Sequence, residues 1–353
     1  MIFIHIGKSK TATTSIQLGL LENRETLLKL GYLYPTSCII GQGHHNIYFE
    51  LFKSKQFDAN KGTIADLLQE IKEFKKKNPA GHIIISSETL EAAIYPLGDT
   101  NILSSILSEK AMASIQNRHL KFLHGQLSNI DEVKVLFFLR RQDYYLQSFW
   151  AMEVIRMEML ATPNEYILAN LDRPDLNYHQ IIVRLFTVFQ KQNVIVSTFE
   201  QLLQGEVLNN FLQLCGFKKE HLKFIIPPVK ANAAVCPIAL ELIRQLAIKY
   251  SKQLTIERKN LLVHAVSAIA EKKEWQHIGP SKKALLKKEV YEQVVEIFSA
   301  TNQAVKDLYP TIGQYLDFEK KTNKDSLLTI DLIPVQDLIS LSIFSFISSK
   351  ELL

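Results

Sequence analysis

Residues 1–30 read MIFIHIGKSKTATTSIQLGLLENRETLLKL and contain the pattern that decides the fold. The apolar run Ile2–Ile6 carries three isoleucines and is too short for a typical helix, which favours a buried strand. A loop of small and hydroxylated side chains follows over Gly7–Ser15, and the run Ile16–Leu30 then has a helical pattern. A strand, a short loop and a helix in this order are typical of α/β proteins.

Three later runs repeat the strand pattern, each followed by polar residues and then by a helical segment: His82–Ser86, Lys134–Leu139 and Asn193–Phe199. Strands that alternate with helices predict a parallel sheet covered on both faces. We therefore expect an α/β fold with a P-loop-like parallel sheet flanked by helices. In such sheets ligands bind at the carboxyl ends of the strands, so the turns after these runs are the places to search.

Beyond Ile225 the strand signals become sparse, and amphipathic helical patterns take over at Ile238–Tyr250 and Lys282–Leu308. This change predicts a helical C-terminal lobe packed on the α/β core. The predicted division is one domain over residues 1–320, with a core of about 1–225, a lobe of about 226–320, and a tail of unknown role over 321–353.

The composition fits a folded protein, with 353 residues, 47% hydrophobic side chains and a net charge of +5. This charge favours anionic ligands but is too small to indicate nucleic acid. The chain has three cysteines without a CxxC pair, no leader-like N-terminus and no apolar run long enough to span a bilayer. We expect a cytoplasmic protein. A docking or dimer helix and a membrane-surface helix are alternatives for the tail, but packing on its own domain is favoured.

The loop after the first run has the chemistry of an anion site. At a helix N-terminus, backbone N–H groups and the helix dipole both attract negative charge. The side chains that add cations and hydroxyl groups here are Lys8, Lys10, Thr11, Thr13, Thr14 and Ser15. A plain N-cap would explain one hydroxyl, but not two lysines and four hydroxyls in one turn. The G-x-x-x-x-G-K-[ST] spacing of a Walker A loop is missing.

The segment Lys10-Thr11-Ala12-Thr13-Thr14 resembles the 5′-phosphosulfate loop, Lys-x-Gly-Thr-Thr, of sulfotransferases that use 3′-phosphoadenosine 5′-phosphosulfate (PAPS). Ala12 stands where that family has glycine, and alanine is strained there if the position needs positive φ. The stretch from Glu22 to Pro35 is also similar to bacterial members that act on carbohydrates. The resemblance covers about residues 1–310.

Further matches concern the 3′-phosphate and the adenine of the donor. Arg140 ends a predicted strand and Ser148 follows eight residues later in a helix, which is similar to the family's 3′-phosphate motif. Phe199 stands where the family has a tyrosine that contacts adenine. Asn232 matches the asparagine of an Asn-x-Ser motif whose serine is Ala234 here.

The resemblance implies transfer of a sulfuryl group from PAPS to a hydroxyl or amine of a glycan or lipid. The product would be the desulfonated nucleotide, 3′-phosphoadenosine 5′-phosphate (PAP), and no metal would be needed. Lys10 would donate to the leaving oxygen, and a base would deprotonate the acceptor. Glu88 has the better predicted location for this role, whereas His44 and His45 have the better intrinsic chemistry. The alternatives are a nucleotide-dependent kinase on a related fold and a non-catalytic protein that binds a nucleotide or a glycan.

Overall fold

The computed structural model describes residues 1–94, 109–228, 235, 237–270 and 286–318. These residues form two compact units, each discontinuous in sequence. The first unit comprises 1–140, 174–231 and 301–316, and the second comprises 141–173, 232–300 and 317–353. Asn232 and the tail over 321–353 lie outside the described residues.

The first unit contains a five-stranded, all-parallel sheet in the order β2-β3-β1-β4-β5. The strands are β1 (Ile2–Ile6), β2 (Tyr32–Leu33), β3 (His82–Ser86), β4 (Val133–Leu139) and β5 (Val194–Thr198). The prediction of a parallel α/β sheet is therefore confirmed. Sequence analysis missed β2, because two residues carry no strand pattern of their own.

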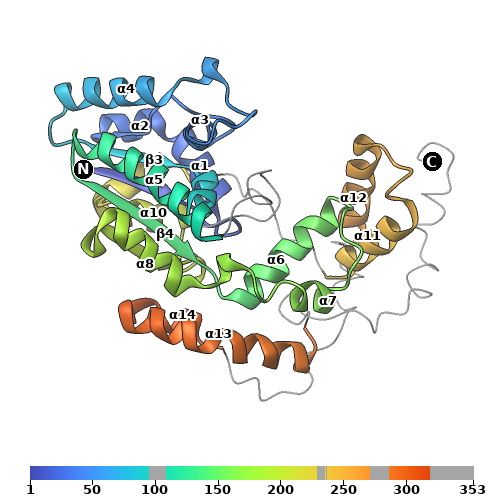
Figure 1. The fold of residues 1–353 in the computed structure, drawn as a ribbon. Helices are drawn as coiled ribbons and strands as arrows, with labels where there is room; N and C mark the ends of the chain where they lie inside the picture. The colour runs from blue at the N-terminus through green and yellow to red at the C-terminus, as the bar shows by residue number, and fades with distance from the viewer. Residues whose placement is uncertain (95–108, 229–234, 236, 271–285, 319–353) are drawn as a thin grey trace. The chain divides into compact units, whose positions relative to one another are not determined.

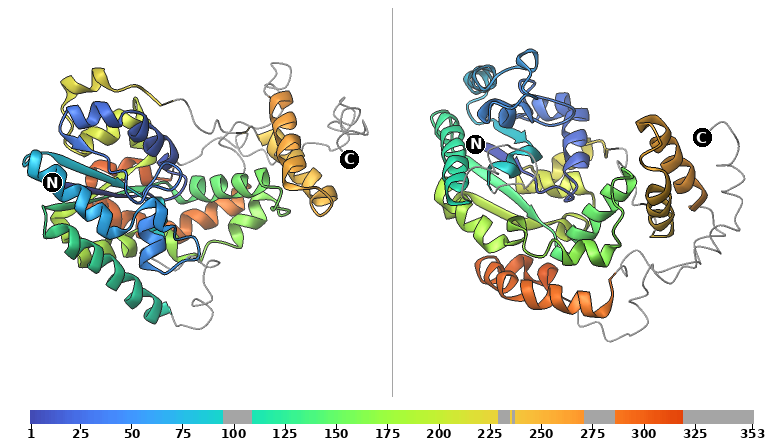
Figure 2. Two further views of the ribbon diagram at one scale, coloured as in Figure 1. Left: turned by 90° about the horizontal axis from the view of Figure 1, so that it is seen from above. Right: turned by 45° about the vertical axis from the view of Figure 1, so that its right-hand side comes forward.

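Helices cover both faces of this sheet (Figures 1 and 2). The residues that face the first side come from all five strands and pack with α3 (Asn46–Leu51), α4 (Ile64–Lys77), α5 (Glu109–Ser128) and α8 (Tyr178–Phe189). The second side packs with α1 (Thr13–Glu22), α2 (Arg24–Lys29) and α10 (Val207–Leu214). The expected helix over Ile16–Leu30 is thus two helices, separated at Asn23.

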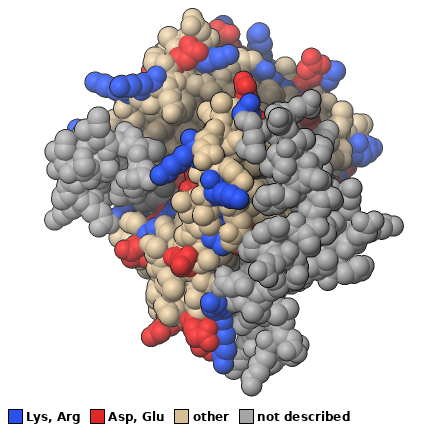
Figure 3. All heavy atoms as spheres, turned by 90° about the vertical axis from the view of Figure 1, so that its right-hand side faces the viewer, with Lys and Arg blue, Asp and Glu red and all other residues tan. Residues whose placement is uncertain are grey.

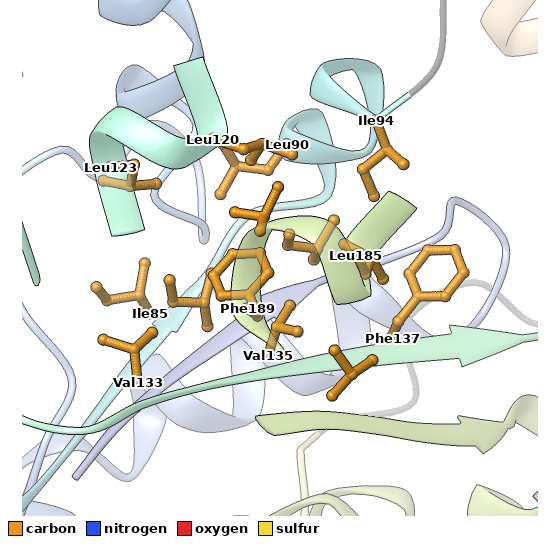
Figure 4. Packing of buried hydrophobic residues seen from close by; sticks show 14 of the residues in the cluster. Ile85, Leu90, Ile94, Leu120, Leu123, Val133, Val135, Phe137, Leu185 and Phe189 are labelled. Atoms are coloured by element: carbon orange, nitrogen blue, oxygen red, sulfur yellow. The ribbon is translucent and has the colours of Figure 1, made fainter. Parts of the chain in front are cut away.

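The packing of the first side explains why the central strands are mostly apolar. Figure 4 shows Val133, Val135 and Phe137 of β4 lying against Leu185 and Phe189 of α8. Alternate residues of a strand point to opposite faces, so a strand buried on both sides is mostly apolar, and its buried polar residues pair, as Nδ1 of His5 does with the Ser86 hydroxyl at 2.8 Å. Beyond the ends of such strands, polar side chains no longer have to be buried in the core.

Short helices follow several strands and connect the larger elements. They are η1 (Ala59–Lys61), η2 (Glu88–Ala93), η3 (Pro174–Leu176), η4 (Lys191–Asn193), α9 (Phe199–Leu202), η5 (Lys219–Phe224), η7 (Pro310–Ile312) and α14 (Gly313–Leu316). Two of them, η2 and α9, begin directly beyond the carboxyl ends of β3 and β5.

The second unit is helical and contains α6 (Gln142–Ile155), α7 (Pro163–Leu168), α11 (Pro237–Tyr250), α12 (Ile256–Ala270) and most of α13 (Lys288–Leu308). The structure thus assigns residues 141–173 to the helical unit, whereas the predicted core extended to about residue 225. The physical reason is packing, because Trp150 and Val154 of α6 share an apolar cluster with Ile243 of α11.

On the face that Figure 3 shows, the described Lys and Arg side chains are interspersed with Asp and Glu side chains. No helix among the described residues is both long enough and apolar enough to span a bilayer.

Candidate functional site

The loop after β1 is held in a conformation that alanine and lysine seldom adopt. Lys10 and Ala12 have φ values of 66° and 65°, in the left-handed region. Each such residue costs roughly 1–2 kcal/mol unless it is glycine. At the start of the loop, a Cβ atom on Gly7 would lie 2.2 Å from Cγ2 of Thr13, so only glycine lets the chain turn this closely back onto α1. The position where the resembled family has glycine does have positive φ here.

Helix α1 begins directly beyond this loop, with Ala12 as its N-cap. Alanine has no side-chain acceptor, so no side-chain cap occupies the first backbone N–H groups of α1. Thr13 and Thr14 lie in the first turn, and no acidic side chain lies there. A helix start of this kind is suited to an anion.

Lys8 is the most buried ionic side chain of the loop, with an exposed fraction of 0%. Its Nζ atom lies 3.1 Å from Oε1 of Glu91 and 3.1 Å from Oδ2 of Asp175, and it donates to the Asp175 carbonyl at 2.9 Å. Burial alone would lower the pKa of Lys8, but the two carboxylates outweigh this effect and raise the pKa above its usual value. A contact between Lys8 and a bound donor would require this network to break.

The other oxygen of Glu91 binds the next residue of the loop. Oε2 of Glu91 accepts from the Ser9 backbone N–H at 2.9 Å and from the Ser9 hydroxyl at 3.1 Å. The hydroxyl of Thr11 donates to the Lys8 carbonyl at 2.5 Å. The loop is therefore braced from η2 and η3, and Lys8, Ser9 and Thr11 form the braced part.

Lys10 and Arg140 meet at the adjoining ends of β1 and β4. Nη1 of Arg140 donates to the Lys10 carbonyl at 3.0 Å. The guanidinium carbon of Arg140 lies 4.6 Å from the ring centroid of Phe199, the first residue of α9. The Tyr178 hydroxyl donates to the Arg140 carbonyl. Three of the predicted donor-binding residues, Lys10, Arg140 and Phe199, thus come together where neighbouring strands end.

Glu88 and His45 lie on the other side of β1. The Thr13 hydroxyl donates to Oε2 of Glu88, which starts η2 beyond β3. Nδ1 of His45 lies 3.3 Å from the Ser87 hydroxyl and 3.4 Å from the Thr89 hydroxyl. Burial lowers the pKa of His45, and the charge of Glu88 opposes this change in part. A half-buried, neutral imidazole beside a carboxylate can accept a proton at neutral pH.

His44 is in a different situation from His45, although the two are adjacent. His44 is fully buried, and the Ser86 backbone N–H donates to its Nδ1 at 3.2 Å. Nε2 then carries the proton and donates to the Pro35 carbonyl at 3.2 Å. Burial lowers the pKa of His44 to about 4. Both ring nitrogens are occupied by the backbone, so in this conformation His44 holds the loop and cannot reach a substrate.

Two further predicted residues lie on helices. Ser15 follows Thr14 in the first turn of α1, and Ser148 lies in α6, which belongs to the second unit. Sequence reasoning missed Glu91 and Asp175, which brace the loop. Glu91 lies three residues beyond Glu88 and shares its helix, but no signal in the sequence connects Asp175 with a lysine 167 positions away.

Among the described residues, no group of three or more His, Cys, Asp or Glu side chains is arranged to hold a metal ion. The chain matches no family model, no curated protein and no solved structure at a significant level.

Proposed function

We propose that the protein is a sulfotransferase that uses PAPS as donor and a hydroxyl-bearing glycan or lipid as acceptor. The observation that carries the proposal is the loop after β1. It pairs a left-handed Ala12 with an uncapped start of α1, at the carboxyl end of the central strand. Arg140 adds a guanidinium group that is bound to the Lys10 carbonyl, and Lys10 is itself a cationic residue of the loop. The loop therefore supports an anion site with the Lys-x-x-Thr-Thr chemistry expected for a 5′-phosphosulfate.

The proposed reaction forms one bond and breaks one bond at sulfur. The base takes the proton of the acceptor hydroxyl, whose oxygen attacks the sulfur atom. The bond between sulfur and the 5′-phosphate oxygen breaks, and PAP leaves with the electron pair. Lys10 and the N–H groups of α1 would stabilise the charge that develops on the leaving phosphate.

The base has two candidates, Glu88 and His45. Thr13 connects Glu88 with the donor site, because its hydroxyl binds Glu88 while its backbone begins the helix proposed to hold the phosphate; His45 is affected by the charge of Glu88. A base at this point lies next to the proposed leaving group, as direct transfer between acceptor and donor requires. His44 is not proposed for this role, since its nitrogens are bound to the backbone.

Donor selection tests the proposal. Purified protein is mixed with PAP, ATP and adenosine 5′-phosphate, and the ligands are ranked by the rise in melting temperature that each causes. PAP should stabilise most, because a ligand that binds only the folded state raises stability with its affinity. A larger rise with ATP than with PAP would favour a kinase instead.

Arg140 sharpens this test, since its planar fork is proposed to bind the 3′-phosphate. Losing a charge-assisted contact costs about 1.5–3 kcal/mol, so Arg140→Ala should weaken PAP binding by roughly tenfold to a hundredfold. Affinity for adenosine 5′-phosphate, which lacks the 3′-phosphate, should barely change. Isothermal titration calorimetry of both ligands gives the comparison.

The matched control is Lys72→Ala, which removes an exposed cation from α4. It should change neither affinity. If Arg140→Ala reduces the affinity for both ligands equally, then Arg140 supports the loop through Lys10 or the ring of Phe199, and its assignment to the 3′-phosphate is wrong.

A further inference from the structure

Helix α1 presents a second polar side chain on the face that carries Thr13. Gln17 lies four residues after Thr13, one turn along the helix, and the two are 2% and 3% exposed. Thr13 donates to Glu88. Gln17 lies instead against Gly43, where a Cβ atom would approach Nε2 of Gln17 to 2.7 Å and Nε2 of His45 to 2.8 Å. The amide of Gln17 and the imidazole of His45 thus converge on Gly43.

The amide nitrogen of Gln17 is buried and has no hydrogen-bond partner among the described residues. Burying such a donor without an acceptor lowers stability, and leucine would fill similar space without that cost. Of the other buried polar groups of this region, Lys8 and His44 are hydrogen-bonded, whereas Nε2 of His5 also has no partner among the described residues. A ligand that binds beside the candidate base could accept the hydrogen bond that this donor lacks.

We propose that Gln17 is a recognition group for the acceptor, donating a hydrogen bond from its carboxamide to an oxygen of a sugar. The inference rests on the proposed function and adds a specificity residue to it. A hydroxyl group is both donor and acceptor, and so is a carboxamide, which lets Gln17 read a hydroxyl-rich ligand. Gln17 is fully buried and His45 is half-buried beside the same Gly43, so a ligand would reach the Gln17 amide only after a neighbouring side chain moves.

Gln17→Leu separates recognition from a structural role. If the amide waits for a ligand, the melting temperature of the unliganded variant should equal or exceed that of the natural protein. The rise caused by PAP should stay the same. With methyl glycosides of glucose, galactose and N-acetylglucosamine as acceptors, KM should rise at least tenfold. Such a change has a physical basis, since sites that bind a hydroxyl discriminate strongly through it.

Gln147→Leu is the matched stability control. Gln147 is also a buried glutamine on a helix, but its amide donates to the Asp143 carbonyl at 3.1 Å. This variant should therefore melt at a lower temperature. The inference is overturned if Gln17→Leu destabilises like Gln147→Leu and leaves the KM for every glycoside unchanged.

Gly43→Ala decides the case in which Gln17→Leu changes both stability and KM. The new methyl group would displace the ends of Gln17 and His45 without removing either. A raised KM in this variant supports recognition, and an unchanged KM contradicts it.

Failure of the donor proposal is seen separately, as the lack of a PAP-dependent rise in melting temperature. In that event, saturation-transfer NMR measures binding of the same glycosides to the natural protein and to Gln17→Leu. Loss of signal in the variant supports the inference. Equal signals, or no glycoside binding to the natural protein, overturn it.

Discussion

The two sides of β1 carry different chemistry at the carboxyl edge of the sheet. On the side of β4, which we call the β4 flank, lie Arg140 and Phe199, with Arg140 bound to the Lys10 carbonyl. On the side of β3, the β3 flank, lie Glu88 and His45. The β4 flank offers the guanidinium cation of Arg140 and an aromatic ring, whereas the β3 flank offers groups that accept protons. Under the proposed function, the anionic donor would bind toward the β4 flank and the acceptor, which loses a proton, toward the β3 flank.

Removing the base should have the largest effect on turnover. A positioned general base contributes about 10²–10⁴-fold to a rate. We expect one of Glu88→Gln and His45→Asn to reduce kcat by this factor, while PAP affinity changes little because neither residue lies on the β4 flank. Measuring sulfate transfer to a methyl glycoside together with PAP affinity checks both parts.

The pH profile distinguishes the two candidates. Since burial lowers the pKa of His45, a histidine base would be deprotonated over the whole neutral range. Activity would then fall only as the pH drops below the usual histidine range, and His45→Asn would abolish this fall. If both variants keep most of their activity, the β3 flank does not supply the base, and the assignment of proton-accepting chemistry to this flank is wrong.

The adjacent histidines should have different roles: we expect His44 to affect stability and His45 to affect turnover. The pKa of His44 is lowered by burial to about 4, against 6.5 in the unfolded chain. As the pH falls below about 6.5, His44 is protonated in the unfolded chain but stays neutral in the folded chain. The free energy of unfolding therefore decreases until about pH 4. The loss is about 1.4 kcal/mol per pH unit, or about 3 kcal/mol in all.

The measurement is urea unfolding at pH 7, 5 and 4 for the natural protein and His44→Asn. Asparagine can still accept from the Ser86 N–H, but it does not titrate. The variant should be less stable at pH 7 and should lose about 3 kcal/mol less on acidification. His5, whose pKa is lowered by burial to about 3, titrates in both proteins and cancels in the difference. Parallel pH curves for the two proteins would show that His44 does not stay neutral in the folded state.

Local patterns predicted the sheet well because each long strand is a short apolar run followed at once by polar residues. Ile2–Ile6 and His82–Ser86 were predicted with the bounds that the structure has. The same patterns located the loop residues and Glu88, since these directly follow strand ends. They could not separate His44 from His45, because the difference lies in which backbone groups fold around each ring.

Long-range pairing was also beyond reach. Lys8 and Lys10 are two residues apart in a loop and look alike in sequence, yet Lys8 is buried between Glu91 and Asp175. The position of Asp175 depends on how the chain returns to the first unit at Pro174, after the segment Arg141–Arg173 of the second unit. Likewise, the segment Arg141–Arg173 joins the helical unit because α6 packs against α11. The local sequence pattern of the segment does not indicate this packing.

The smallest effect is expected at Ala12, between the two flanks. Its φ of 65° is strained for alanine and suits glycine, so Ala12→Gly should relieve roughly 1–2 kcal/mol in the folded state. Glycine also gives the unfolded chain more freedom, at a cost of about 0.4–1 kcal/mol, which leaves a net gain of about 0–1.6 kcal/mol. The midpoint of urea unfolding should rise slightly. Ala92→Gly is the matched control, because Ala92 is a buried alanine of η2 without positive φ, and this change should lower the midpoint. A lower midpoint in Ala12→Gly would mean that the methyl group of Ala12 contributes packing that outweighs the strain, and the loop would then be adapted to alanine.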